Sequence, residues 1–203
     1  LDKISDLGGA INMFGYSQSL LVNDDLVYCQ PGGKENNVVA LNRFTGKLVW
    51  SQKGNSEVEA YGSPIIYKRG NRELLLTFSE LAFLGIDGKS GELMFISKMD
   101  TAGNLHGNIP ILDGDDLYYT EGDGNRTVKY KLAADGSSVT EVWRNRDFDN
   151  IMGGVVRLGN KIYGTAHRQM YLKCLDMKTG QVTDSLKMFR GSTVAADGML
   201  YVY

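Results

Sequence analysis

Aromatic and polar residues recur at a fixed spacing in this chain, and their types suit ligand or partner binding. Tyr61 lies 45 residues after Tyr16, and His106 lies 45 residues after Tyr61. Ile151 continues the series. Phenol, imidazole, amide and guanidinium groups together can bind a planar or anionic ligand, or can anchor a partner protein. The predicted binding residues are the three spaced residues, two nearby amides and an arginine at the corresponding later position: Tyr16, Tyr61, His106, Asn108, Asn150 and Arg190.

Two other interpretations of these residues stay open. Their polar groups can line a water-filled channel without binding anything. His106 can also act as a general base, because the ordinary pKa of histidine lies near neutrality. No carboxylate accompanies His106 at a fixed spacing, and His167 falls in a loop between strands. We therefore predict no catalytic residue.

Acidic loops and cysteines suggest metal or redox chemistry only weakly. Asp113-Gly114-Asp115-Asp116 and Asp123-Gly124-Asn125 resemble calcium loops in spacing, but they lack the glycine and closing glutamate of an EF-hand. Asp-Gly pairs are first of all turn formers. Cys29 and Cys174 stand alone in apolar runs of different repeats, which predicts two buried thiols. We predict no metal site.

A repeated sequence motif, called the repeated phrase below, positions all of these residues. Val39–Trp50 reads as a strand, a Thr-Gly turn and a second strand that contains a tryptophan. Copies occur at 83–95, 130–143 and 172–181, and the turn glycines fall at 46, 91, 136 and 180. A period of this length indicates a propeller or another repeat array. The glycine permits a positive φ, and the Asn or Asp before the turn can bind the turn backbone.

Each repeat contains four short apolar segments separated by turns, which predicts one four-stranded antiparallel blade. The repeats lie near 16–60, 61–105, 106–150, 151–188 and 189–203, and the last holds only two strands. We therefore expect an all-β chain that forms a single, partial β-propeller domain of about four and a half blades. The aromatic residues at 50, 95 and 143 are placed to pack against a neighbouring blade.

The phrase apolar-x-Ala-Leu-Asn/Asp-x-x-Thr-Gly-Lys-x-x-Trp resembles the repeat of the quinoprotein-like (PQQ-like) β-propeller family. Val39–Trp50 is the best copy, and 130–143 departs most from it. The resemblance covers nearly the whole chain and implies a ring of seven or eight blades. Since four and a half blades cannot close such a ring, we expect a longer natural protein or self-association through open blade edges.

The resemblance also implies two functions. The first is a non-enzymatic scaffold in the periplasm or cell envelope, similar to the propeller lipoprotein of the outer-membrane assembly machinery, with an envelope or outer-membrane protein as partner. The second is a PQQ-dependent or sugar-handling enzyme with its active site in the central channel. Enzymes of this type hold PQQ with calcium, and several carry adjacent cysteines, which Cys29 and Cys174 are not. We favour the scaffold and expect no cofactor.

Composition excludes other classes of protein. The 203 residues carry a formal net charge of −2, so the chain lacks the basic footprint of a nucleic-acid-binding domain. Its apolar runs are of strand length, so we expect no membrane-spanning segment.

Overall fold

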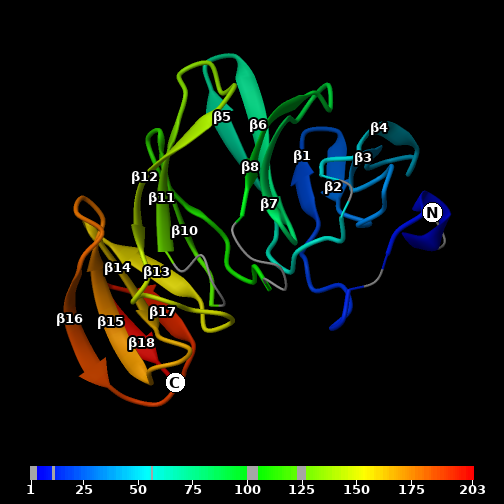
Figure 1. Ribbon diagram of the computed structural model, residues 1–203. Coiled ribbons are helices and arrows are strands. Elements are labelled where there is room, and N and C mark those ends of the chain that lie inside the picture. The colour runs from blue at the N-terminus through cyan, green and yellow to red at the C-terminus, as the bar shows by residue number, and fades with distance from the viewer. Residues whose placement is uncertain (1–3, 11, 56, 100–104, 123–126) are drawn as a thin grey trace. The chain divides into compact units, whose positions relative to one another are not determined.

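The computed structural model describes residues 4–10, 12–55, 57–99, 105–122 and 127–203. Within these ranges the regular structure is antiparallel β-sheet, apart from the short 3-10 helix η1 (Ile4–Leu7) (Figure 1). Four sheets have four strands each, and a fifth has two. The expected all-β propeller fold with about four and a half blades is thereby confirmed. No helix in the described ranges is both long and apolar enough to cross a membrane.

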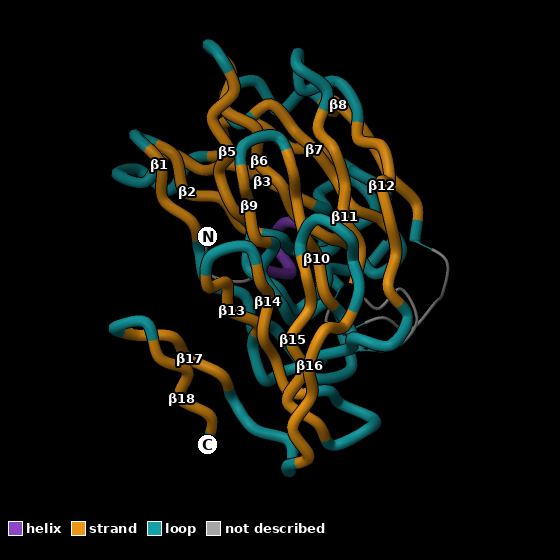
Figure 2. Tube along the Cα trace, turned by 90° about the vertical axis from the view of Figure 1, so that its left-hand side faces the viewer, coloured by secondary structure: helices purple, strands orange, loops and turns teal. Residues whose placement is uncertain are grey.

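The strands of each sheet follow one another in chain order. The first sheet contains β1 (Leu21–Asn23), β2 (Leu26–Cys29), β3 (Val38–Asn42) and β4 (Leu48–Gln52). The second contains β5 (Ile65–Arg69), β6 (Arg72–Ser79), β7 (Ala82–Asp87) and β8 (Leu93–Lys98). The third contains β9 (Ile111–Asp113), β10 (Asp116–Thr120), β11 (Thr127–Leu132) and β12 (Val139–Asn145). The fourth contains β13 (Val155–Leu158), β14 (Lys161–Thr165), β15 (Tyr171–Asp176) and β16 (Val182–Lys187). The two-stranded sheet contains β17 (Thr193–Ala196) and β18 (Met199–Val202) (Figure 2).

Two compact units make up the chain. The first comprises Leu1–Gly103 with Ala133–Val139, and the second comprises Asn104–Leu132 with Thr140–Tyr203. The first two sheets lie in the first unit. The fourth sheet and the two-stranded sheet lie in the second, together with β9, β10 and β11.

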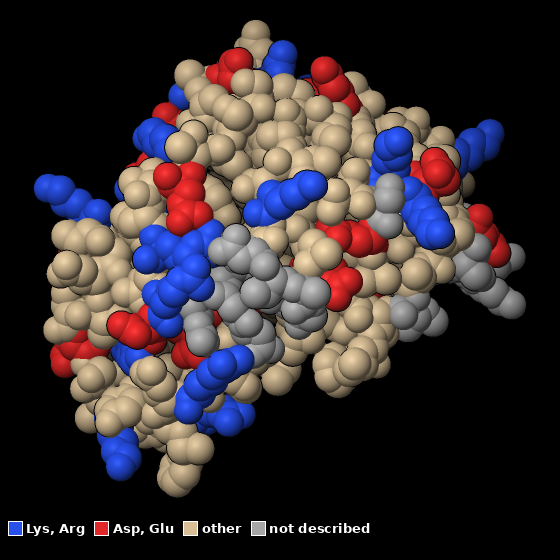
Figure 3. Space-filling view, viewed as in Figure 1, with Lys and Arg blue, Asp and Glu red and all other residues tan. Residues whose placement is uncertain are grey.

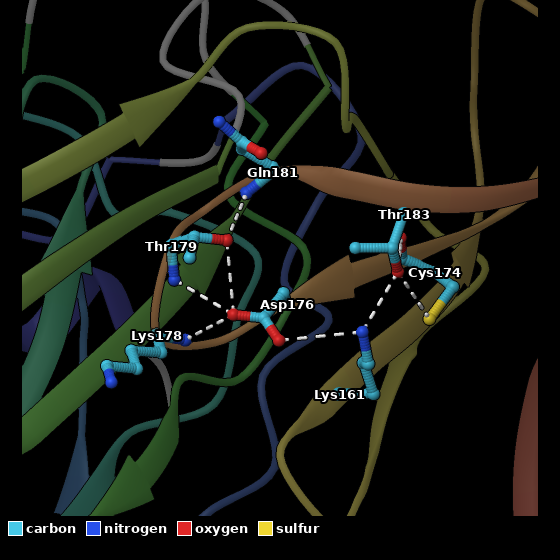
Figure 4. Close-up of polar contacts among 7 residues, drawn as sticks. All are labelled: Lys161, Cys174, Asp176, Lys178, Thr179, Gln181 and Thr183. Carbon is cyan, nitrogen blue, oxygen red and sulfur yellow. Dashed lines mark hydrogen bonds and ion pairs between the residues drawn. The ribbon is translucent and has the colours of Figure 1, made fainter.

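The turn between the third and fourth strands forms as the repeated phrase predicts. In the fourth sheet, Asp176 Oδ1 accepts hydrogen bonds from the backbone N–H groups of Lys178 (3.0 Å) and Thr179 (2.9 Å) (Figure 4). The Thr179 hydroxyl donates to the same oxygen at 3.1 Å. Gly180 then adopts a φ of 72°, a backbone conformation that costs glycine little. Asn42 and Asp87 bind their own turns in the same way. The side chain therefore fixes the turn from within.

Tryptophans join adjacent sheets within each unit. Trp50 from β4 covers Gly91 of the second sheet, and its indole N–H donates to the Gly88 carbonyl at 3.0 Å. In the second unit Trp143 covers Gly180. These two contacts are the inter-blade packing that the sequence predicts. Each tryptophan also packs against the apolar core of its unit.

Phe95 behaves differently from the two tryptophans. Its ring lies over Gly85, its partner across β7 and β8, and packs edge-on against Phe83 of its own sheet. Ala40 holds the equivalent position opposite Trp50. Because Gly85 has no side chain, it leaves the space that the Phe95 ring fills. The second sheet thus has glycine where the first has alanine, and its aromatic residue packs within its own sheet instead of against the next one.

Candidate functional site

The predicted residues of the first unit tie backbone segments together. The Tyr16 hydroxyl lies 3.1 Å from the carbonyl oxygen of Ala10 and 2.9 Å from that of Pro31, and both carbonyls accept from it. Burial, and then the nearby Glu59 carboxylate, raise the pKa of Tyr16. The Tyr61 hydroxyl accepts a hydrogen bond from the backbone N–H of Phe14 at 3.1 Å. Both phenols therefore hold the segment before β1 in place.

Glu59 is a buried carboxyl of the first unit that the sequence prediction missed. The residue is only 1% exposed, and neither carboxylate oxygen has a hydrogen bond of normal geometry, although the backbone N–H groups of Glu59 and Asn12 lie near the carboxylate. Burial raises the pKa of Glu59. The carboxylate occupies the space beside Gly32, where a Cβ atom would collide with it.

In the second unit, His106 is buried and its backbone is strained. Its φ is 38°, which is uncommon for a residue with a side chain. The ring is 1% exposed, and its Nδ1 lies 2.5 Å from the hydroxyl of Tyr119. Burial raises the pKa of Tyr119 well above its ordinary value. The imidazole therefore takes part in an interior contact.

Asn108 and Asn150 connect consecutive segments of the second unit through their amide groups. Asn108 Nδ2 donates to the carbonyls of Thr120 at 2.9 Å and of Asn150 at 2.6 Å. Asn150 Nδ2 donates to Thr165 at 2.9 Å and Gly154 at 3.3 Å. Both side chains are at least nine-tenths buried, and Oδ1 of Asn150 has no partner. These bonds fix the loop that contains Asn150.

That loop forms one wall of a cavity of about 270 Å³ that lies wholly within the second unit. The other walls come from the end of β14 and the turn after it, and from the segments on either side of the two-stranded sheet. The cavity combines amide, hydroxyl, imidazole and guanidinium groups with apolar side chains. Its lining residues are Asn150, Ile151, Met152, Gly153, Thr165, His167, Arg190, Gly191, Ser192 and Tyr203.

Two large apolar side chains are exposed at or next to this cavity. Met152, which lines it, is 79% exposed, and Phe189, next to Arg190 in the chain, is 82% exposed. We call these two residues the apolar rim. Four of the six predicted residues thus lie in the second unit, where Asn150 and Arg190 line one cavity and Asn108 supports Asn150. Tyr16 and Tyr61 lie in the first unit.

The sequence prediction missed Thr165 and Tyr203 as lining residues, and it placed His167 in a loop without assigning it to the site. A usable signal was present in the repeat. Thr165, the last residue of the second strand of its sheet, lies against the segment that leads to the next sheet, since its hydroxyl accepts from Gly191 N–H and donates to Gly191 O. His167 comes shortly after β14.

The cysteines and acidic loops of the sequence analysis are next considered for metal or redox chemistry. Cys29 and Cys174 are both free thiols, and Cys174 is buried as predicted, but the prediction of a buried thiol is wrong for Cys29, which is only partly buried. Asp113 pairs with Arg157 at 2.9 Å, and Asp116 pairs with Lys129 at 2.6 Å. The second acidic loop, Asp123-Gly124-Asn125, lies outside the described residues. In the part of the chain that the structure describes, no three acidic, histidine or cysteine side chains come together as metal ligands.

Comparison with known proteins bears on the fold and the family. The profile of a family described as outer membrane protein assembly factor BamB matches residues 9–184. No curated protein sequence matches.

Solved structures with similar folds include the computationally designed protein Ika8, with a TM-score of 0.62 and 13% identity over 90% of this chain and 54% of that one. A europium-containing methanol dehydrogenase gives a TM-score of 0.57 and 14% identity over 87% of this chain and 42% of the other. Quinohemoprotein alcohol dehydrogenase from Comamonas testosteroni gives a TM-score of 0.57 and 12% identity. The match covers 93% of this chain and 39% of the dehydrogenase. This chain spans about half or less of each, and at these identities the similarity establishes the fold alone.

Proposed function

Because this chain belongs to the family of outer membrane protein assembly factor BamB, we propose that it is a non-enzymatic β-propeller scaffold of a bacterial envelope protein. Its partner is a protein, bound through the apolar rim and the cavity of the second unit. We further propose a location in the periplasm or at the cell envelope, with lipid anchoring, from the family alone.

The observation that carries this proposal is the apolar rim beside Arg190. Met152 and Phe189 are both more than three-quarters exposed. Methionine, aromatic residues and arginine are the types enriched in the buried centres of protein interfaces. Covering this surface would release about 25 cal/mol for each Å² of apolar area removed from water. Exposed apolar surface of this kind commonly marks an interaction site.

The rim is carried on a prearranged loop. Asn150 is held by its own bonds to Thr165 and Gly154, and by the bond from Asn108. Loops that are ordered before binding lose less conformational freedom when the partner arrives. The buried asparagines of the predicted site therefore act as positioning residues in this proposal, and the exposed residues make the contact.

Photo-crosslinking tests the proposal. A photoreactive phenylalanine analogue at position 189 should give a discrete crosslinked product in envelope extracts of the source organism. The matched control is the same analogue at Phe44, which is 71% exposed but lies in a turn of the first unit. Met152→Ser should reduce the yield at position 189. Equal yields at positions 189 and 44, unaffected by this substitution, would contradict the proposal.

Thermal unfolding distinguishes the scaffold from an enzyme that uses PQQ with calcium. A ligand that binds the folded state at 100 times its Kd stabilises that state by about 2.7 kcal/mol. For the scaffold we expect the melting temperature to stay unchanged with PQQ and calcium at saturating concentrations. A rise of several degrees would favour the enzyme.

A further inference from the structure

We propose that the open edge of β4 binds an extended segment of a partner protein, which adds to the first sheet as a further strand and carries an acidic residue at each end. This edge belongs to the first unit, whereas the apolar rim belongs to the second. The inference therefore goes beyond the proposed function. It specifies both the backbone conformation and the charge pattern of the segment that fits.

The edge of β4 offers backbone groups for pairing. β4 is the last strand of the first sheet and pairs with β3 on one side. No backbone hydrogen bond joins Leu48–Gln52 to a described residue outside β3. The N–H and C=O groups that face away from β3 form a row that another extended chain can pair with. Partner segments commonly bind in this way, as an added strand held by main-chain hydrogen bonds.

The absence of charge distinguishes β4 from the fourth strands of the other four-stranded sheets. Leu48–Gln52 contains no charged residue. Charged side chains on an edge strand are a common defence against pairing with another chain. The other fourth strands each contain at least one, namely Lys98 in β8, Glu141 and Arg144 in β12, and Asp184 and Lys187 in β16. Among these strands, β4 is therefore the most open to strand addition.

A β-bulge limits where the added strand can pair. Val49 is the extra residue of this bulge and has no opposite residue in β3. Trp50–Gln52 keep a regular register with β3, so we expect the ladder of the added strand to form along these residues. Leu48 and Val49 are 49% and 50% exposed beside them. Apolar side chains of the added strand can pack against these two residues as cross-strand neighbours.

Two lysines select the charge of the added segment. Lys47 and Lys53 stand immediately before and after β4, and both are exposed. Neither forms an ion pair with a described residue. A second copy of β4 laid antiparallel along this edge would bring lysine near lysine at both ends, and like charges facing each other destabilise a sheet. A segment with Asp or Glu at both ends forms favourable pairs instead, so charge favours such a partner over a second copy.

Titration of the whole chain with strand-forming peptides, followed by backbone amide chemical shifts, tests the inference. The acidic probe is acetyl-Glu-Val-Thr-Val-Thr-Val-Glu-amide, and the basic probe has lysine in place of both glutamates. We expect saturable shifts along Leu48–Gln52 with the acidic probe. The basic probe should bind about fivefold more weakly or worse, because two attractive charge pairs become repulsive.

Charge reversal in the protein tests the role of the two lysines. Lys47→Glu together with Lys53→Glu should reverse the preference, so that the basic probe binds more tightly. The matched control is Lys178→Glu together with Lys187→Glu, which changes two exposed lysines of the second unit and alters the net charge equally. This control should leave the preference for the acidic probe unchanged.

A third peptide tests the backbone pairing. Acetyl-Glu-Val-Thr-Pro-Pro-Val-Glu-amide keeps the acidic ends, but its two successive prolines remove an N–H group from each edge of the peptide. It should not saturate the chain in the range where the acidic probe does.

Four results would overturn the inference. They are no saturable binding of the acidic probe, equal binding by the basic or the proline peptide, a preference that survives charge reversal, and shifts along Leu48–Gln52 that grow with the concentration of the chain alone. The last would show that a second copy occupies the edge. Crosslinking at position 189 does not involve β4, so the proposed function stands or fails separately.

Discussion

Trp50 and Trp143 occupy equivalent places in the two units, but only one has a partner for its indole N–H. Trp50 donates to the Gly88 carbonyl at 3.0 Å, whereas Nε1 of Trp143 is buried without a partner. Trp50→Phe removes ring volume and a hydrogen bond, and Trp143→Phe removes ring volume and an unpaired donor. We expect the first to lower the free energy of unfolding by about 1–2 kcal/mol more than the second. Urea unfolding followed by circular dichroism measures the difference. Equal losses would contradict this account.

Glu59 and Glu73 should respond to pH in opposite directions. Burial raises the pKa of Glu59, so the folded state holds the proton more tightly and stability falls as pH rises through the window above the ordinary glutamate pKa. The pKa of Glu73 is lowered by hydrogen bonds from Lys68 and then Asn23, so its contribution is present above the ordinary pKa and is lost as pH falls.

The matched substitutions follow from these signs. Glu59→Gln should stabilise the chain at neutral pH and remove the loss of stability that accompanies rising pH. Glu73→Gln should destabilise it at neutral pH and leave its stability less sensitive to acid. Melting temperatures measured between about pH 3 and pH 8 cover both the acidic range in which a glutamate with a lowered pKa takes up its proton and the range above the ordinary glutamate pKa. A loss of stability in Glu59→Gln at neutral pH would show that the carboxylate has a stabilising partner.

The glycines of the repeated turn have two separable roles. Gly46 and Gly91 have φ angles of 68° and 76°, but a Cβ at Gly46 would meet nothing within 4 Å, whereas one at Gly91 would lie 2.7 Å from the Trp50 ring. Gly46→Ala should therefore cost about 1–2 kcal/mol of backbone strain. Gly91→Ala should cost a further 1–3 kcal/mol or so, because the indole must move. Urea unfolding checks both. Similar losses would mean that the Trp50 ring adapts freely.

Strands and turns were predictable from the sequence where residues close together in the chain determine them. The turn at 45–46 is determined by Asn42, Thr45 and Gly46 within a few residues of one another, and the turns that begin at Asp87 and Asp176 follow the same rule. The packing of Phe95 was not predictable in this way. It depends on Gly85, which lies ten positions earlier in the chain and faces Phe95 only after β7 and β8 have paired.

The candidate site was predictable in part for the same reason. A spacing of 45 residues identified the series from Tyr16 to Ile151. Asn150 was then predicted as the amide beside Ile151, and Arg190 as the residue at the corresponding place in the fifth repeat. The spacing could not show that the Asn150 amide turns inward to Thr165 and Gly154, or that the Glu59 carboxylate is buried without a hydrogen bond of normal geometry. These depend on contacts between sheets, which the repeat does not encode. Tyr203 was missed as a lining residue because it belongs to the incomplete fifth repeat.

At the scale of the whole molecule, charge should contribute little to partner binding. The chain has 22 basic and 24 acidic residues, and both signs are interspersed over the face in Figure 3. The proposed interface holds one arginine among exposed apolar residues. Apolar contacts are insensitive to moderate salt, and a single exposed ion pair is weak and readily screened. Partner binding should therefore not depend on long-range attraction between the molecules.

We expect the Kd of the crosslinked partner to change by less than about threefold between about 50 and 300 mM sodium chloride, because only one exposed charge pair is screened. Binding to the immobilised chain, with Arg190→Gln as the control, measures this. In that variant the remaining salt dependence should disappear, since its source has been removed. A steep loss of affinity that persists in Arg190→Gln would show that a charged surface away from the cavity recognises the partner, and the apolar rim would then lose its central role.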